Sequence, residues 1–326
     1  MVKIHFLNVG HGDCSVIEHA NGNLTMIDIN NGSELTEEDA KPILESLASS
    51  RMDYLGKVMA GQNGWRTWPE LLAEAGYDIE LTNPVGFFKN EFPGKSIFRY
   101  IQTHPDFDHM RGLAALREEG IGITNFWDTQ HTKSPNPDET SDEDMAEWAE
   151  YQRLRKGEAC TVLRLNRGAK GVYYNQNPAG VDGGNGLHIL SPTPELTKEF
   201  DKDGKRNELS YVIQYRYAGR TVIFGGDAEQ GAWQSIYDCY GQNLKCDVLK
   251  ASHHGRDTGY HQEAVKAMSP SYTIVSVGKK PETDATNKYR QYSDEVWSTR
   301  WFGNMTLQID AEGTISWEAE KVRNEN

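Results

Sequence analysis

The chain has 326 residues, of which 37% are hydrophobic and 25% are charged, a composition typical of a soluble globular protein. Its formal net charge of −14 argues against a sequence-reading DNA-binding protein, because a strongly acidic surface repels nucleic acid at long range. No apolar run approaches the roughly 20 residues that span a bilayer, and the N-terminus reads as a strand rather than a signal peptide. We therefore expect a cytoplasmic protein with no membrane partner.

The first half of the chain mixes short strands with helical segments. Asn21-Gly22 is a hairpin signal between two of the strands, and an acidic, Pro-containing surface loop is expected over residues 133–145. Residues 36–80 look helical and irregular, with a helix that begins near Pro69. Strands are predicted over residues 2–9, 14–18, 24–29, 98–102 and 123–127, and further helices over residues 110–119 and 143–156.

The second half repeats one pattern, in which a buried strand ends in polar residues. Strands are predicted over residues 187–190, 210–217, 220–224, 246–250, 273–277, 305–310 and 313–317, and a helix over residues 228–240. Asp227 follows one of these strands and His253-His254 follows another. Because helices and strands interleave, we predict an α/β fold whose polar strand ends gather at one edge of the sheets.

The segment His104-Pro-Asp106-Phe-Asp108-His109 places two histidines and two aspartates directly after a predicted strand. Imidazole nitrogens and carboxylate oxygens in one loop can hold a divalent cation without bridging distant elements. A polar turn in which one aspartate caps the next helix would explain one carboxylate but neither histidine. The sequence therefore predicts a metal site here.

Two later strand ends carry the same kind of residue. Asp227, after two glycines, can bridge two metals, although an aspartate after a strand is often only a helix N-cap. The adjacent His253 and His254 point in different directions, so one can bind a metal while the other faces the substrate as an acid or hydrogen-bond donor.

Taken together, these motifs resemble the metallo-β-lactamase superfamily, and within it the soluble domain of the ComEC-type competence proteins. The resemblance implies a single domain over residues 1–326 with an αββα sandwich of two mixed β-sheets flanked by helices. Residues 33–96 would be inserted into it, and residues 133–185 would be a helical and loop decoration. The matching segments are Phe6-Leu-Asn-Val-Gly-His-Gly-Asp13, Met26-Ile-Asp28, Thr103-His-Pro-Asp-Phe-Asp-His-Met-Arg-Gly-Leu113, Asn207-Glu-Leu-Ser210, Gly225-Gly-Asp-Ala228, Lys250-Ala-Ser-His-His-Gly255 and Val275-Ser-Val-Gly278.

The resemblance also implies two divalent metal ions, zinc or manganese, with magnesium as a further candidate. Asp106 stands where many superfamily members have histidine, and a carboxylate there shifts the preference from zinc toward manganese or magnesium. One metal is expected on His104 and Asp106, and the other on Asp108, His109 and His253, with Asp227 as the bridge. A water between the metals would lose a proton near neutral pH and attack the substrate.

Further roles follow from the same comparison. Catalytic roles are expected for Asp108, His254 and Lys250. The middle histidine ligand of many members has no clear counterpart; His131 is a candidate, whereas His188 is more readily explained as a strand residue. Contacts with the ligands or the substrate are expected from Asp13, Asp28, His11, His131, Asn207 and Lys279.

Three functions are compatible with these residues. The resemblance favours a nuclease or phosphodiesterase that acts on nucleic acid or a nucleotide, because ComEC-type domains are regarded as nucleases. The same fold could instead hydrolyse a carboxylic ester, lactone or amide, although the carboxylate-rich site speaks against this. The third alternative is a non-enzymatic regulatory protein that retains the metal scaffold.

Overall fold

The computed structural model describes residues 1–31, 44, 67–74, 80–175, 184–277 and 284–321. Most of the predicted helical region over residues 36–80, and also Lys279, therefore lie outside the described residues. The helix predicted near Pro69 lies within them as α3 (Trp68–Glu74). Among the helices of the described residues, none is long and apolar enough to cross a membrane.

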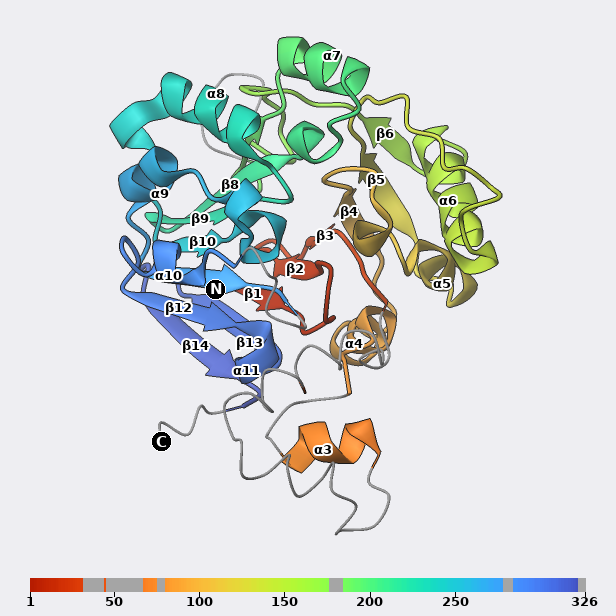
Figure 1. Ribbon diagram of the computed structural model, residues 1–326, viewed down its shortest axis with the longest axis horizontal. Helices are drawn as coiled ribbons and strands as arrows, with labels where there is room; N and C mark the ends of the chain where they lie inside the picture. Colours follow the sequence, from red (N-terminus) through yellow and green to blue (C-terminus); the bar gives the residue numbers. More distant parts are fainter. Residues whose placement is uncertain (32–43, 45–66, 75–79, 176–183, 278–283, 322–326) are drawn as a thin grey trace.

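Two mixed sheets form the centre of the described molecule (Figure 1). The first has the strand order β14-β13-β1-β2-β3-β4-β5-β6, and the second has the order β12-β11-β10-β9-β8-β7. The strands of the first sheet are β1 (Val2–Phe6), β2 (Ser15–Glu18), β3 (Leu24–Ile27), β4 (Ile97–Ile101), β5 (Ile123–Trp127), β6 (Thr161–Leu163), β13 (Met305–Ile309) and β14 (Ile315–Ala319). Those of the second sheet are β7 (Leu187–Ser191), β8 (Val212–Tyr217), β9 (Arg220–Phe224), β10 (Val248–Lys250), β11 (Tyr272–Val275) and β12 (Glu295–Ser298).

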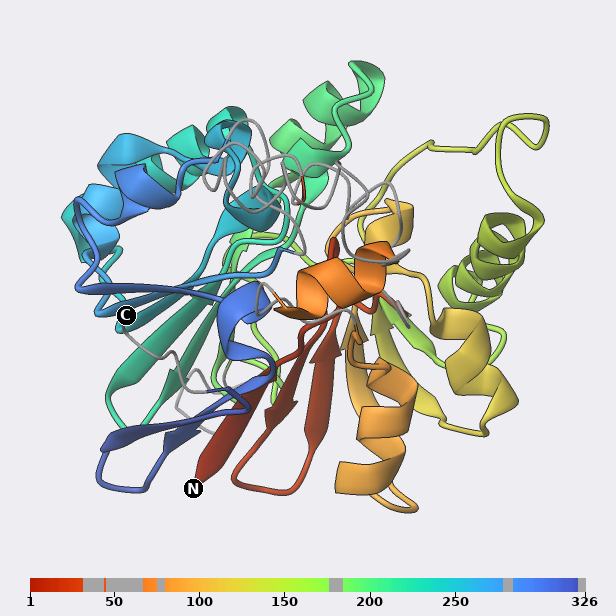
Figure 2. The same ribbon diagram turned by 60° about the horizontal axis from the view of Figure 1, so that its bottom comes forward.

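The two sheets face each other across a shared apolar core. Alternate strand residues point inward from both sheets, as period-two alternation requires, and Phe6 stacks on Phe224 across the core with ring centroids 6.0 Å apart. The first sheet is covered on its other face by α4 (Pro84–Glu91), α5 (Leu113–Glu118) and α6 (Asp142–Arg155). The second is covered by α8 (Gln230–Tyr240), α9 (Gln262–Met268) and α10 (Thr286–Tyr289). Figure 2 shows these layers from a second direction, so the predicted αββα sandwich is confirmed.

Helix α6 shows how local sequence sets one of the outer layers. Ser141 caps it by accepting a hydrogen bond from the Asp144 amide, its first turn is acidic, and its last turn is basic, which complements the helix dipole. Trp148, Tyr151 and Leu154 recur every three residues and are buried against the first sheet. The charged helix predicted over residues 143–156 therefore packs one apolar face against the first sheet.

Parts of both segments set apart in the predicted domain contribute to the core. Helix α6 packs into the core and β6 adds a strand to the first sheet. Val85, Phe88 and Phe92 of the α4 region are buried against that sheet. The extent of a single domain over residues 1–326 stays a prediction.

Parallel strand pairing brings the polar strand ends together. Strands β3 and β4 are parallel in the first sheet, and β9 and β10 are parallel in the second. Asp28 follows β3, His104 follows β4, Asp227 follows β9, and His253 follows β10. Because the carboxyl ends of parallel strands share an edge and the two sheets face each other, these residues meet at one end of the sandwich.

Candidate metal centre

The loop after β4 folds back so that its two histidines are neighbours. The buried Gln102 amide donates to the carbonyls of His104 and His109, at 2.8 and 3.0 Å. These two bonds tie both ends of the loop to one side chain. As a result the rings of His104 and His109 lie with centroids 4.2 Å apart, and both side chains are fully buried.

Asp227 approaches this loop from the second sheet. A Cβ on the preceding Gly226 would lie 3.1 Å from side-chain carbons of Ser210 and Thr103, and Gly226 has a φ of +51°, so glycine fits best there. The Ser210 hydroxyl accepts from the Asp227 amide at 3.1 Å and fixes the turn. The Asp227 carboxylate is thereby held, buried, against the histidines of the loop.

The turn after β10 has an unusual backbone. His253 and His254 have φ values of +50° and +53°, a left-handed conformation that side chains other than glycine rarely adopt. This geometry directs the two rings to different surroundings. The Nδ1 of His254 lies 3.2 Å from the Ser276 carbonyl and can only donate to it, which leaves the Nε2 lone pair free to face Asp227 and Asp108.

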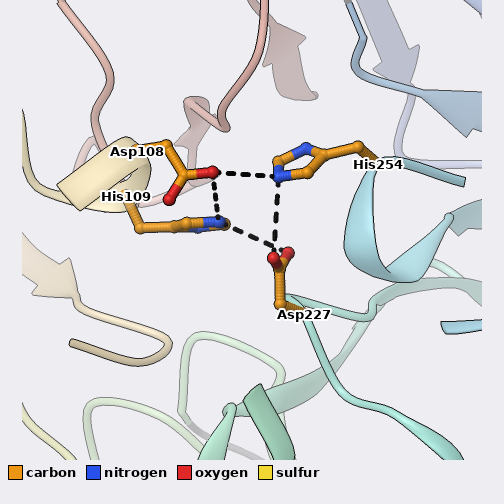
Figure 3. A group of neighbouring side chains, drawn as sticks. All are labelled: Asp108, His109, Asp227 and His254. Atoms are coloured by element: carbon orange, nitrogen blue, oxygen red, sulfur yellow. Dashed lines mark ion pairs between the residues drawn. The ribbon is translucent and has the colours of Figure 1, made fainter. Parts of the chain in front are cut away.

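Four side chains from these elements form one compact group, shown in Figure 3: Asp108, His109, Asp227 and His254. Their ligand atoms all lie within 4.8 Å of one another. The His109 Nε2 is 3.3 Å from Asp227, and the His254 Nε2 is 3.3 Å from Asp108 and 3.6 Å from Asp227. Such spacing fits ligands that surround a single cation at ordinary metal–ligand distances of about 2.0–2.2 Å.

The hydrogen bonding of the group also fits a cation. Within the described part of the chain, the buried atoms without a hydrogen-bond partner include the Nε2 atoms of His104, His109 and His254 and one oxygen of Asp227. Buried polar atoms without partners are costly, and here they converge on one place. The opposite nitrogen of His109 donates to Asp28 at 2.8 Å, the carboxylate–histidine arrangement that orients metal-binding imidazoles. We conclude that the residues present fit a divalent metal ion.

The electrostatics agree with this conclusion. Burial alone would raise the pKa of Asp227, but the neighbouring His109 and His254 hold that pKa well below its usual value. Burial would likewise lower the pKa of His109, yet Asp227, Asp28 and Asp108 raise it well above its usual value. The carboxylates therefore attract positive charge to this place, which a divalent cation would supply in place of protons.

A second, more open position lies beside the first. The Nε2 of His104 is 3.5 Å from Asp106 and 3.9 Å from Asp227. Asp106 also binds the Lys133 ammonium at 2.5 Å, an ion pair that the sequence analysis did not anticipate. His104, Asp106 and Asp227 are thus placed to hold a second cation, with Lys133 as a charged neighbour.

The two adjacent histidines lie differently from what the sequence predicted. The side chain of His254 is 1% exposed and belongs to the compact group. That of His253 is 15% exposed, and its Nδ1 faces the Thr258 hydroxyl at 2.7 Å and Glu229 at 3.2 Å. His253 comes no nearer to Asp227 than 3.8 Å. The ligand position expected for His253 is therefore occupied by His254, because the left-handed turn aims the second ring inward.

Lys250 also differs from its expected catalytic role. Its side chain is buried and pairs with Asp13 at 2.6 Å. The backbone amide of Asp13 in turn donates to the Asp108 carbonyl at 3.3 Å. Lys250 therefore holds the loop of Asp13 against the metal loop and does not face a substrate, since strand β10 carries its side chain into the interior.

The remaining predicted residues divide into two groups. Asp28 supports His109, and His11 lies at the rim with its Nε2 3.7 Å from Asp108; burial, more than any neighbour, lowers the pKa of His11 to about 4. Asn207, in contrast, donates to Glu229 at 3.2 Å instead of facing the group. His131 is turned away from it, because its two nitrogens bond the Tyr151 hydroxyl and the Lys133 amide.

Three polar residues near the group were missed by sequence reasoning: Lys133, Glu229 and Arg256. Lys133 lies in a stretch that looked like an ordinary acidic surface loop, and nothing in its spacing connects it to Asp106. Arg256, two residues after His254, stood next to the recognised motif and could have been considered.

No family model matches the chain. ComE operon protein 3 of Bacillus subtilis (strain 168) is 28% identical over 132 residues, which is 40% of this chain and 15% of that protein. Competence protein ComA of Neisseria gonorrhoeae is 27% identical over 135 residues, 40% of this chain and 18% of that protein. The chain thus matches less than a fifth of the length of these relatives.

Among solved structures, the CmlA beta-hydroxylase E377D mutant is similar over 94% of this chain and 54% of that chain, with 11% identity and a TM-score of 0.49. The αββα sandwich carries a group of metal-type ligands at the shared edge of its sheets, and these ligands come from the motifs identified in the sequence. In its fold and in the order of its motifs the chain thus resembles the metallo-β-lactamase superfamily, and 40% of it is similar in sequence to ComE operon protein 3 and to competence protein ComA.

Proposed function

We propose that this protein is a metal-dependent hydrolase that cleaves phosphodiesters. The observation that carries the proposal is the convergence of unpartnered donor atoms from His104, His109, His254 and Asp227 on one buried place. Divalent cations bound there would make a water more acidic and neutralise charge that develops on the substrate. Both effects are needed to hydrolyse a phosphodiester.

The protein's own residues would prepare the site for this chemistry. Asp28 orients His109, and the Ser276 carbonyl orients His254, so both imidazoles would present Nε2 to a bound cation. Asp227 would help to hold a cation at either position, because its carboxylate lies near both His104 and His109. Lys133, paired with Asp106, places a positive charge beside the site, where it would attract an anionic substrate.

The choice of a phosphodiester rests on chemistry and on resemblance. Carboxylate oxygens from Asp106, Asp108 and Asp227 suit the hard cations that assist phosphoryl transfer. ComEC-type domains, which the motifs resemble, are regarded as nucleases, and one of the two relatives is named a competence protein. The net charge of −14 favours a small phosphodiester or a single strand that enters locally over a long duplex.

The proposal is tested by loading the purified protein with manganese, zinc or magnesium. Substrates are bis(p-nitrophenyl) phosphate, single-stranded DNA and a lactone. We expect phosphodiester hydrolysis with at least one metal, its loss on chelation, and little lactone hydrolysis. The Asp227→Asn variant should lower kcat/KM by at least about 100-fold and reduce bound metal, because it removes the shared carboxylate charge.

Asp294→Asn, at an exposed position before β12, is the matched control and should leave both quantities unchanged. Absence of metal uptake, together with no hydrolysis of either phosphodiester with all three metals, would refute the proposed function. Faster hydrolysis of the lactone than of both phosphodiesters would retain the metal site but replace the substrate class.

A further inference from the structure

Arg256 lies at the edge of the metal group and its backbone is held from both sides. Its amide donates to the His253 carbonyl at 3.0 Å, its carbonyl accepts from the Gly259 amide at 3.1 Å, and it forms a β-bridge with Asp284. The start of its side chain is therefore fixed relative to the turn that carries His254. The end of the side chain reaches toward the N-terminal loop, where its Nη2 lies 3.5 Å from the His11 Nε2.

The guanidinium of Arg256 has no anionic partner among the described residues. Two other cationic side chains beside the site, among the residues that the structure describes, are paired: Lys250 with Asp13 at 2.6 Å and Lys133 with Asp106 at 2.5 Å. In the described part of the chain the Arg256 guanidinium contacts the imidazole of His11, and its Nε is buried with no hydrogen-bond partner there. A part-buried guanidinium with unused donors gains strongly from an added anion.

The side chain of His11 lies between Arg256 and the metal group. His11, which Arg256 touches, lies with its Nε2 3.7 Å from Asp108, and its ring centroid is 4.6 Å from that of His254. The free donors of Arg256 thus border the place where the oxygens of a substrate held at Asp108 and His254 would lie. Lys133 borders the same group from the side of Asp106.

We propose that Arg256 binds a non-bridging oxygen of an anionic phosphate substrate and makes the site select charged phosphodiesters over neutral esters. The proposal rests on the function proposed above and names the group that recognises the substrate's charge. A planar guanidinium suits this task because two of its N–H groups can meet two phosphate oxygens at once. Lysine at this position would retain the charge but lose the paired geometry.

The first measurement is binding, so that it does not depend on turnover. Manganese-loaded protein is titrated with thymidine 5′-monophosphate by calorimetry, for wild type, Arg256→Met, Arg256→Lys and Arg290→Met. We expect Arg256→Met to raise Kd by about 10–100-fold, the range for loss of a hydrogen bond to a charged group, and Arg256→Lys to raise it less. Arg290 is exposed and donates to Asn287, so its variant should match wild type.

The second measurement separates substrate binding from support of His11. Arg256→Met should raise KM for bis(p-nitrophenyl) phosphate far more than it lowers kcat. In a His11→Asn background the same change should still weaken nucleotide binding several-fold, whereas an arginine that acts only through His11 would have no further effect there. Thermal unfolding of each variant checks that the fold persists, and Arg256→Lys provides a test if Arg256→Met does not fold.

The outcomes distinguish this inference from the proposed function. An active wild type in which Arg256→Met leaves Kd unchanged refutes the role of Arg256 and leaves the phosphodiesterase intact. A wild type that binds the nucleotide through Arg256 but hydrolyses no phosphodiester refutes the proposed function and retains the anion site. A wild type that does not bind the nucleotide refutes the role of Arg256.

Discussion

Both ends of the sandwich contain buried polar groups, but the hydrogen bonding of these groups differs between the two ends. At the end where β8 turns into β9, a cavity of about 660 Å³ is lined by residues that include His19, His188 and Tyr215. Beneath it the buried Arg99 donates to Thr25 at 2.6 Å and to Asn185 at 3.0 Å. The opposite end, at the carboxyl ends of β4, β9 and β10, holds the candidate metal centre.

The difference lies in where the polar atoms point. Arg99 and His19 both bond the Thr25 hydroxyl, although the Nδ1 of His19 has no partner among the described residues. At the metal end, the Nε2 atoms of three histidines face a common space and lack partners in the described part of the chain. A large hollow is therefore a poorer guide to function in this fold than a set of buried donors that converge without bonding each other.

The largest expected effect separates the two adjacent histidines. His254→Asn should lower metal affinity and kcat/KM by at least about 100-fold, or roughly 3 kcal/mol, because it removes an inward-facing ligand. His253→Asn should cost less than about 10-fold, since this side chain bonds Thr258 and faces Glu229. Bound metal per chain and kcat/KM are measured for both. Equal losses in the two variants would contradict the placement.

A smaller effect is expected for a residue that orients a metal ligand. Asp28→Asn should weaken metal binding by about 10–100-fold, because the neutral amide no longer draws the His109 N–H and raises the basicity of its other nitrogen. Calorimetric titration with manganese measures this change. His188→Asn at the opposite end is the control, and its affinity should equal that of wild type. An unchanged affinity in Asp28→Asn would mean that His109 is oriented by packing alone.

The smallest effect concerns stability at the opposite end. Burial, with a further contribution from Arg99, lowers the pKa of His19 to about 3. Between pH 6.5 and about 3 the unfolded chain binds a proton at this residue and the folded chain does not, so stability falls as pH falls through this window. His19→Gln should reduce the loss between pH 6.5 and 4.5 by up to about 2 kcal/mol in urea unfolding. Equal pH slopes for both proteins would disprove this.

Much of the fold could be predicted because its strands are short apolar runs bounded by turn residues. All twelve predicted strands are present, although β6 and β12 were missed because Thr161–Leu163 and Glu295–Ser298 show little buried apolar pattern. The site was accessible for a similar reason. Its ligand-type residues stand at strand ends, and residues 104–109 concentrate four of them in one loop.

What could not be predicted depends on backbone geometry and on distant contacts. Sequence alone does not show which of two consecutive histidines a left-handed turn aims inward. It does not show that Lys250 forms an ion pair with Asp13, which is 237 positions away, or that His131 bonds Tyr151. Lys133 lies beside Asp106 because of the path of a long loop, and the sequence pattern does not predict that path.

The left-handed turn has a consequence for the protein without its metals. His253, His254 and Gly255 follow one another with φ of +50°, +53° and +76°, and each of the two histidines costs roughly 1–2 kcal/mol in that conformation. A cation bound by His254 would offset this cost and stabilise the turn. Chelation should therefore open this corner before the sheets, so that hydrogen exchange and protease cleavage begin at the very residues that hold the ion.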